Sequence, residues 1–384
     1  MKKSILAVAL TAVIGLAHAE SSNVTLWGRI DAGIAGQTNV GTPNGNNIQM
    51  LASPMKASVF GIRAKEDLGG GMTAGADLES QNILTSTGNV QQDPQGGGTT
   101  PIFARSANVF VKSESLGEVR LGRQYSVLNN LQGQVDALGG LNFGSSLTFM
   151  NDATSFGGGA TKAGIANYSG GQFVSSGITY TTPTFAGVTG QLQYVPGGAS
   201  GNGAFGDADS STKIQAGLKY KSGPVGAVAL YTTGKDANGV EIARTAMLGG
   251  NYTVGPATVY AGYYNLRNPS IAGQANSEFD VYTVSGKYVV KGPFAVSAGY
   301  YHLKDKVNSN NGADQYTLVG TYDVSKRTQF YAGLSSVNNN GTSGFSPIGG
   351  GGNNLNSQFT SGSTNMQNAG MVQTGYVLGM THSF

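Results

Sequence analysis

Charged side chains recur at alternate positions in the first 125 residues, which is the spacing that places residues on one face of an extended strand. The set comprises Arg29, Arg63, Lys65, Arg105, Arg120, Asp77 and Glu79. Charges of both signs around a narrow water-filled passage order the water and screen solutes by charge. The chemistry that these residues indicate is therefore electrostatic.

Other kinds of site are disfavoured by the residue counts. The chain has no cysteine, which excludes disulfides and thiolate metal sites. It has three histidines, and two of them lie near the chain ends, so we expect no metal centre and no cofactor. Removing residues 1–19 leaves 21 basic against 20 acidic residues, a balance that argues against binding to nucleic acid.

Catalysis is also disfavoured, because an acyl-transfer site needs a nucleophile, a base and an orienting group within hydrogen-bond reach. His302 is the only internal histidine, and alternation with Tyr300 and Ala298 places it on the outward face of its strand. A secreted β-solenoid adhesin would need a fixed repeat, whereas the similar hairpins here recur at unequal intervals.

The N-terminal segment has the pattern of a secretory signal peptide. Lys2 and Lys3 precede an apolar run from Ile5 to Leu16, and the small-x-small triplet 17–19 follows. The run is about a dozen residues long, whereas a membrane-spanning helix needs about 20. We therefore expect a signal peptide over 1–19 and a single domain over 20–384.

Period-two alternation between turn residues predicts about sixteen strands, each near ten residues long. The predicted strands are 24–34, 56–67, 72–80, 103–113, 117–126, 174–182, 187–196, 211–221, 225–233, 243–254, 257–266, 278–290, 294–303, 313–323, 327–335 and 372–384. Tyr220, Tyr252 and Tyr288 each precede a turn that contains proline, which predicts an interfacial girdle of tyrosines.

The connections alternate between short turns, such as 223–224, and long loops, such as 35–55 and 336–371. Short turns at one rim and long loops at the other are typical of an all-β transmembrane antiparallel barrel in an outer membrane, with the short turns on the periplasmic side. The chain ends on an aromatic residue at the tip of an alternating strand, so we expect Phe384 to close the barrel.

The third long loop, about 127–173, is too apolar for a free surface loop, because it contains Leu128, Leu131 and Val135. We expect it to pack against the inner wall, narrow the channel and present Asp136 and Asp152.

Alternation places Trp27, Arg29 and Asp31 on the inward face opposite this loop. Arg123 has the opposite parity to Arg120 and should point outward. Because an arginine facing lipid is costly, this position predicts a subunit interface.

Several sequence blocks resemble the general porins of Gram-negative bacteria, most closely the β-proteobacterial ones. They are residues 24–31 (VTLWGRID), 60–62 (FGI) with 66–71 (EDLGGG), 117–125 (GEVRLGRQY), the residues Tyr180, Pro183, Phe185 and Gly187, residues 322–328 (YDVSKRT) and the terminal Phe384. They occur in family order over nearly the whole chain after residue 20.

The resemblance implies a homotrimer of sixteen-stranded barrels in the outer membrane, each with a water-filled pore narrowed by the inward-folded third loop. Family members pass small hydrophilic solutes and ions by diffusion, and many prefer anions. On this basis Arg29, Arg63, Arg105 and Arg120 match pore-facing positions, and Arg123 lies on the trimer-facing side.

Two positions depart from the family pattern. Val59 stands where the family usually has an arginine, and another arginine is missing in the region of Phe173 and Ser176. We therefore expect weaker selectivity than in anion-preferring members, with its sign left open. A substrate-specific channel, using inward Trp27 and Tyr331 to bind one class of solute, is the alternative.

Overall fold

The computed structural model describes residues 22–39, 45–80, 83–85, 102–151, 172–196, 212–235, 241–268, 277–348 and 369–384. The predicted signal peptide over 1–19 and Asp152 lie outside the described residues.

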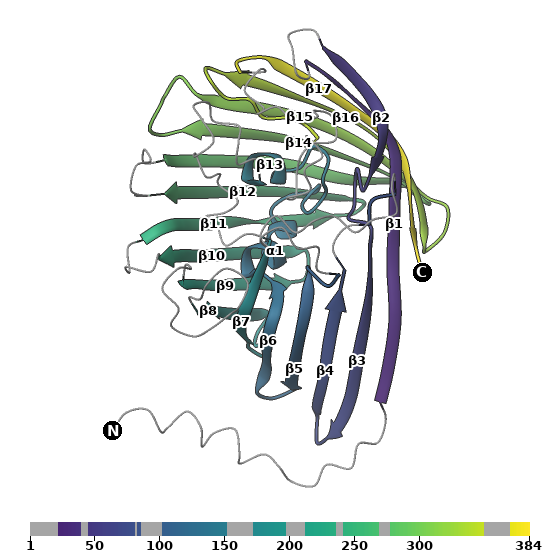
Figure 1. Ribbon diagram of the computed structural model, residues 1–384, viewed down its shortest axis with the longest axis vertical. Coiled ribbons are helices and arrows are strands. Elements are labelled where there is room, and N and C mark those ends of the chain that lie inside the picture. Colours follow the sequence, from purple (N-terminus) through teal and green to yellow (C-terminus); the bar gives the residue numbers. More distant parts are fainter. Residues whose placement is uncertain are drawn as a thin grey trace.

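The described chain forms one antiparallel sheet that closes on itself as a barrel (Figure 1). Its strands are β1 (Ser22–Thr38), β2 (Asn46–Ala52), β3 (Val59–Gly69), β4 (Met72–Glu79), β5 (Ser106–Ser113), β6 (Gly117–Tyr125), β7 (Phe173–Thr181), β8 (Val188–Val195), β9 (Thr212–Ser222), β10 (Val225–Lys235), β11 (Glu241–Val254), β12 (Ala257–Asn268), β13 (Ser277–Lys291), β14 (Phe294–Asp305), β15 (Gly312–Asp323), β16 (Thr328–Asn340) and β17 (Val372–Ser383). Because β2 and β3 both pair with β1 as halves of one interrupted strand, the 17 segments make sixteen barrel strands. The predicted sixteen-stranded barrel is confirmed.

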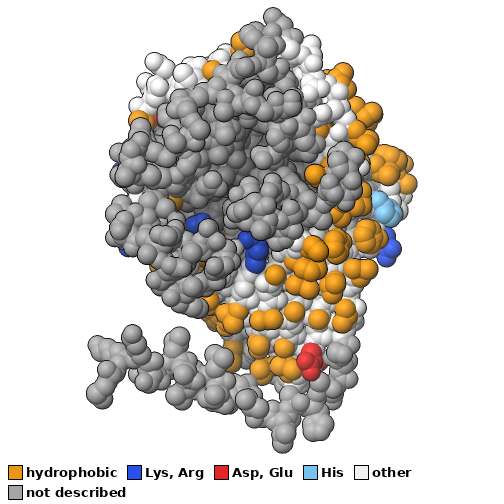
Figure 2. All heavy atoms as spheres, viewed as in Figure 1, with side chains coloured by type: hydrophobic (Ala, Val, Ile, Leu, Met, Phe, Trp, Pro, Cys, Tyr) orange, Lys and Arg blue, Asp and Glu red, His pale blue; other side chains and the backbone are white. Residues whose placement is uncertain are grey.

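Alternation along each strand decides which side chains face the lumen. In β9, Ile214, Leu218 and Tyr220 are exposed on the outer face, whereas Gln215 between them is buried inside. The predicted girdle residues Tyr252 and Tyr288 are also exposed. Figure 2 shows mostly hydrophobic side chains on the part of the outer wall that carries β1 and β3 in Figure 1.

One strand segment was missed by the sequence prediction. Residues 46–52 lie within the loop predicted over 35–55, but they form β2 and pair with the distal half of β1. The period-two signal was present, because Ile48 and Met50 are exposed outward and alternate with polar residues.

The break between β2 and β3, residues 53–58, is held by the buried carboxylate of Asp31. This carboxylate accepts hydrogen bonds from the backbone N–H groups of Met55 and Lys56, both at 3.3 Å, and from Tyr331 Oη at 2.9 Å. Thr381 Oγ1 on β17 also donates to it. Asp31 thereby joins the break to three neighbouring strands.

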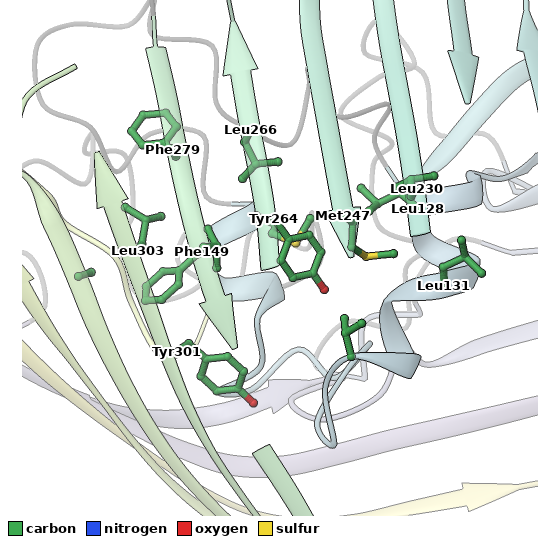
Figure 3. Packing of buried hydrophobic residues seen from close by; sticks show 14 of the residues in the cluster. Leu128, Leu131, Phe149, Leu230, Met247, Tyr264, Leu266, Phe279, Tyr301 and Leu303 are labelled. Carbon is green, nitrogen blue, oxygen red and sulfur yellow. The ribbon is translucent and has the colours of Figure 1, made fainter. Parts of the chain in front are cut away.

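Two loop segments fold into the lumen and give the barrel an apolar core. The third loop contributes α1 (Val127–Leu131), a 3₁₀ turn η1 (Gln132–Gln134) and α2 (Leu147–Asn151). Their apolar side chains pack against inward residues of β10 to β14, including Leu230, Met247, Tyr264 and Leu303 (Figure 3).

The segment after β16 also lies inside the barrel. Phe345 packs edge-on against Phe149 with 5.0 Å between ring centroids, and Gly144 N donates to Pro347 O at 3.0 Å. No helix in the described residues is long and apolar enough to cross a bilayer.

The barrel closes where β17 pairs with β1, which lie side by side in Figure 1. Beyond the last ladder pair, Phe384 and Gly28 exchange two backbone hydrogen bonds of 3.0 Å each. The Phe384 ring lies directly on Gly28, where an added Cβ would come within 2.3 Å of a ring carbon. Gly28 therefore leaves the space in which the terminal ring seals the seam.

We predict that Phe384→Ala lowers the free energy of unfolding by about 2 kcal/mol, roughly half the cost of truncating a fully buried Phe. The reason is that the ring, which is 49% exposed, covers backbone hydrogen bonds at the seam. Urea unfolding in lipid vesicles, followed by heat-modifiable gel mobility, measures this loss. The matched control is Phe330→Ala, which removes an outward ring of 48% exposure within β16. An equal loss in both variants would contradict a special role for Phe384.

Candidate functional site

Four charged residues of β3, β4 and β6 form a continuous network on the inner wall. Asp77 accepts from Arg63 Nε at 2.5 Å and from Arg120 Nη1 at 2.6 Å. Arg120 Nη2 also lies 2.9 Å from Glu118 Oε1, and its guanidinium carbon lies 4.5 Å from the Phe110 ring centroid. We call Arg63, Asp77, Arg120 and Glu118 the wall quartet, and its formal charge sums to zero.

A second compensated pair lies beside the wall quartet. Arg105 Nε donates to Glu79 Oε1 at 3.1 Å, and Tyr125 Oη donates to the same oxygen at 2.7 Å. The Arg105 guanidinium carbon lies 4.8 Å from the centroid of Phe173. One of the two positions that depart from the family pattern thus holds an aromatic ring packed under an arginine. Val59, at the other, is buried.

Two further cations come together where β2 breaks from β3. Arg29 Nε donates to Ala57 O at 3.0 Å, and Lys56 Nζ donates to Gln329 Oε1 at 3.0 Å. Neither side chain forms an ion pair with the residues that the structure describes. Lys56 could not be selected from the sequence, because it is the first residue of the strand predicted over 56–67 and alternation gave no sign that the chain bends into the lumen there.

The wall quartet borders a pocket between the barrel wall and the third loop. Its lining includes Trp27 on β1, Gln124 on β6, Gln191 on β8 and Asn130 on α1. Lys65 lies further along β3 than Arg63, on the same inward face, and its side chain is exposed. The passage thus runs between the charged wall of β3 to β8 and the helix of the inward loop.

Asp136 does not lie where we expected it. It was predicted to face the channel, but it is 2% exposed and anchors the loop instead. Its carboxylate accepts from the backbone N–H groups of Leu138 and Ser146, both at 2.9 Å, and from Tyr301 Oη on β14 at 2.7 Å. The physical reason is that an irregular loop inside a barrel must find acceptors for its own N–H groups.

Arg123 has the outward parity predicted for it, since it pairs with the outward Ala107 of β5. Its guanidinium is held by β7 and by the segment just before β5. Nη1 donates to Ser175 Oγ at 2.7 Å, and Nε donates to Ala104 O. These two hydrogen bonds satisfy some of the guanidinium donors of Arg123 from within the chain.

Comparison with known proteins connects this architecture to one family. The family model described as Gram-negative porin matches residues 6–342. Outer membrane porin protein 32 of Delftia acidovorans is 29% identical over 388 residues, which span 100% of each chain. An outer membrane porin protein of Bordetella pertussis is 28% identical and covers 86% of this chain and 93% of its own length.

Solved structures agree with this assignment. An anion-selective porin from Comamonas acidovorans superposes with a TM-score of 0.74 at 25% identity, covering 95% of this chain and 100% of its own. A trimer form of the outer membrane protein OmpT of Vibrio cholerae has a TM-score of 0.60 at 13% identity, covering 95% and 100%. Because its sequence identity is low, the OmpT structure supports the fold assignment alone.

We predict that Asp136→Asn loosens the third loop at a cost of about 1–3 kcal/mol, because an amide oxygen cannot replace both carboxylate oxygens and buried donors lose their partners. Hydrogen exchange should show faster exchange for the amides of Leu138 and Ser146. Asp323→Asn is the control, because its carboxylate accepts from Gln329 at the exposed turn. Unchanged protection in Asp136→Asn would contradict the anchoring role.

Proposed function

The chain belongs to the Gram-negative porin family, whose members lie in the outer membrane, and from this premise we propose that it forms a water-filled channel for passive diffusion of small hydrophilic solutes and ions. The observation that carries the proposal is a polar, charged passage inside a closed barrel, between the wall quartet and α1. Porins are channels, and the family provides no reason to assign catalysis to this chain.

Charge selectivity is the next part of the proposal. In this passage Arg63, Arg105 and Arg120 are each paired with a carboxylate. Compensated pairs exert a weaker field on a passing ion than isolated charges. Arg29 and Lys56, beside the same passage, form no ion pair with described residues and add uncompensated positive charge, so we propose a weak preference for anions.

The substrate-specific channel remains a second candidate for one reason. Trp27 lies on the lumen face beside the wall quartet, where a solute would contact it. Tyr331 does not support this candidate, because it is buried and its hydroxyl donates to Asp31.

We further propose a homotrimer that assembles through the outer faces of β1 to β6. Exposed outward tyrosines recur on β7 to β17, whereas the described strands β1 to β6 carry none. Aromatic girdles mark contact with the membrane interface, so their interruption indicates contact with protein. The trimeric OmpT structure shows that this fold can assemble in threes.

Side-chain size and charge in this sector support the same assignment. Small residues let neighbouring surfaces approach closely, and the outward positions of β3 to β5 include Ala64, Ala74, Ala76 and Ala107. Outward charges at Glu66 and Arg123 are costly against lipid and are better placed against protein.

We predict that Asp77→Asn raises the anion-to-cation permeability ratio by about two- to threefold in about 0.1 M salt, because Arg63 and Arg120 lose a shared counter-charge. The effect should shrink in about 1 M salt, where the Debye length falls to about 3 Å. The measurement is the reversal potential of single channels under a salt gradient. Asp67→Asn, an exposed carboxylate at the β3–β4 turn, is the control and should leave the ratio unchanged. A shift of the permeability ratio toward cations would contradict the proposal that Asp77 weakens the field of the two arginines.

We predict that Ala76→Trp increases the monomer fraction, because a bulky ring on a closely packed face costs about 1–3 kcal/mol at each contact. Analytical ultracentrifugation in detergent measures the distribution of oligomers. Ala216→Trp makes the same change on the outward face of β9, between Leu192 and Tyr231, and should leave the trimer intact. Dissociation by Ala216→Trp alone would place the interface elsewhere.

A further inference from the structure

The pocket beside the wall quartet has the features of a solute-binding site as well as those of an open passage. It has a volume of about 320 Å³ and is partly open to the channel. Ligand sites in proteins typically occupy about 300–1,000 Å³. Because Asn130 of α1 lies across from the wall residues, a solute in the pocket touches both sides of the narrowed passage.

Trp27 gives this pocket an apolar face and a hydrogen-bond donor. The indole lies directly against Gly61, where an added Cβ would come within 2.6 Å of two ring carbons. Its N–H donates no hydrogen bond to the residues that the structure describes. An aromatic face with a polar edge is suited to a ligand that presents both C–H and O–H groups.

The wall quartet, whose formal charge sums to zero, gives the lining donors and acceptors side by side, and the remaining lining carboxylate, Glu79, is paired with Arg105. The Arg63 side chain is 47% exposed, so guanidinium donors remain accessible beyond its bond to Asp77. Glu118 uses Oε1 for Arg120, and its other oxygen accepts no hydrogen bond from the described chain. Thr181 and Gln191 add a hydroxyl and an amide on the neighbouring strands.

A hydroxyl group both donates and accepts, so a molecule with several adjacent hydroxyls can bond to both kinds of group at once. An ion matches groups of one sign only and is opposed by the other sign. Neutral, hydroxyl-rich solutes therefore fit this lining better than ions of either charge.

We propose that this pocket is a binding subsite for uncharged polyhydroxylated solutes, the chemical class of sugars, with Trp27 supplying the contact face and the wall quartet the hydrogen bonds. The inference rests on the proposed channel function and names a class of solute that the channel retains during passage.

The test is carried out on the folded full-length mature protein with raffinose, a neutral trisaccharide, as the probe. Trp27 is the single tryptophan of the chain, so intrinsic fluorescence reports on this pocket directly. Raffinose should change the emission with a saturable dependence on concentration. In planar bilayers it should also block the ionic current to a saturating level.

Variants then separate binding from simple obstruction. Trp27→Ala should raise the raffinose concentration for half-maximal block by about five- to tenfold, which corresponds to the loss of one aromatic contact. Trp27→Phe keeps a ring and should recover most of the affinity. The matched control is Tyr260→Ala, which removes an inward aromatic ring from the opposite wall of the barrel. Tyr260 pairs with Asn251 and Ser285 on its neighbouring strands, away from the pocket, so its loss should not change the block.

Charge is tested with gluconate, a sugar acid that keeps the hydroxyl groups but is an anion. We expect gluconate to bind more weakly than raffinose to the native protein and to gain affinity in Glu118→Gln, where the wall quartet becomes positive.

The outcomes separate the two proposals. Absence of any ohmic conductance would overturn the channel itself. Normal conductance with unsaturable raffinose effects, or a block that is unchanged in Trp27→Ala, would overturn the subsite alone. Tighter binding of gluconate than of raffinose to the native protein would replace it with an anion site.

Discussion

The structure depends on one constraint, which is that no backbone N–H or C=O group may be left unpaired within lipid. The pairing of β1 with β17, extended by the two bonds between Gly28 and Phe384, removes the sheet edges and satisfies that requirement. Closure also fixes the register of every ladder. Register in turn decides which inward side chains of neighbouring strands lie side by side. Arg63, Asp77 and Arg120 can form one network only because the registers of the β3 to β6 ladders place them on the same face at the same height.

The same requirement explains the burial of the Asp31 and Asp136 carboxylates. Irregular backbone inside the barrel also needs partners, and Asp31 and Asp136 provide them at the β2–β3 break and in the third loop. Tyr331 and Tyr301 complete each cluster from the wall. Acidic residues thus have two different uses here, because Asp77 and Glu79 balance arginines along the passage while Asp31 and Asp136 hold chain segments in place.

Much of this architecture could be predicted from the sequence, since period-two alternation and loop lengths are local properties. They identified the sixteen strands, the closing role of the final strand and the inward face of β1. They did not identify β2, because its short alternating run lay inside a loop-rich stretch. The role of Asp136 could not be predicted in this way, because alternation shows which side of a strand a residue faces but not which groups it bonds to. The donors that surround this carboxylate come from β13, β14 and its own loop. The pairing of Lys56 with Gln329 likewise joins residues 273 positions apart.

The apolar core inside the lumen has a thermodynamic consequence. Lipid covers the outer face of this barrel, but Leu131, Phe149, Tyr264 and Leu303 are shielded from water by other protein side chains (Figure 3). Releasing the inward loops into water hydrates this apolar surface, and such hydration increases the heat capacity. The barrel interior therefore has the temperature dependence of a soluble protein core, with a stability that passes through a maximum and declines on cooling as well as on heating.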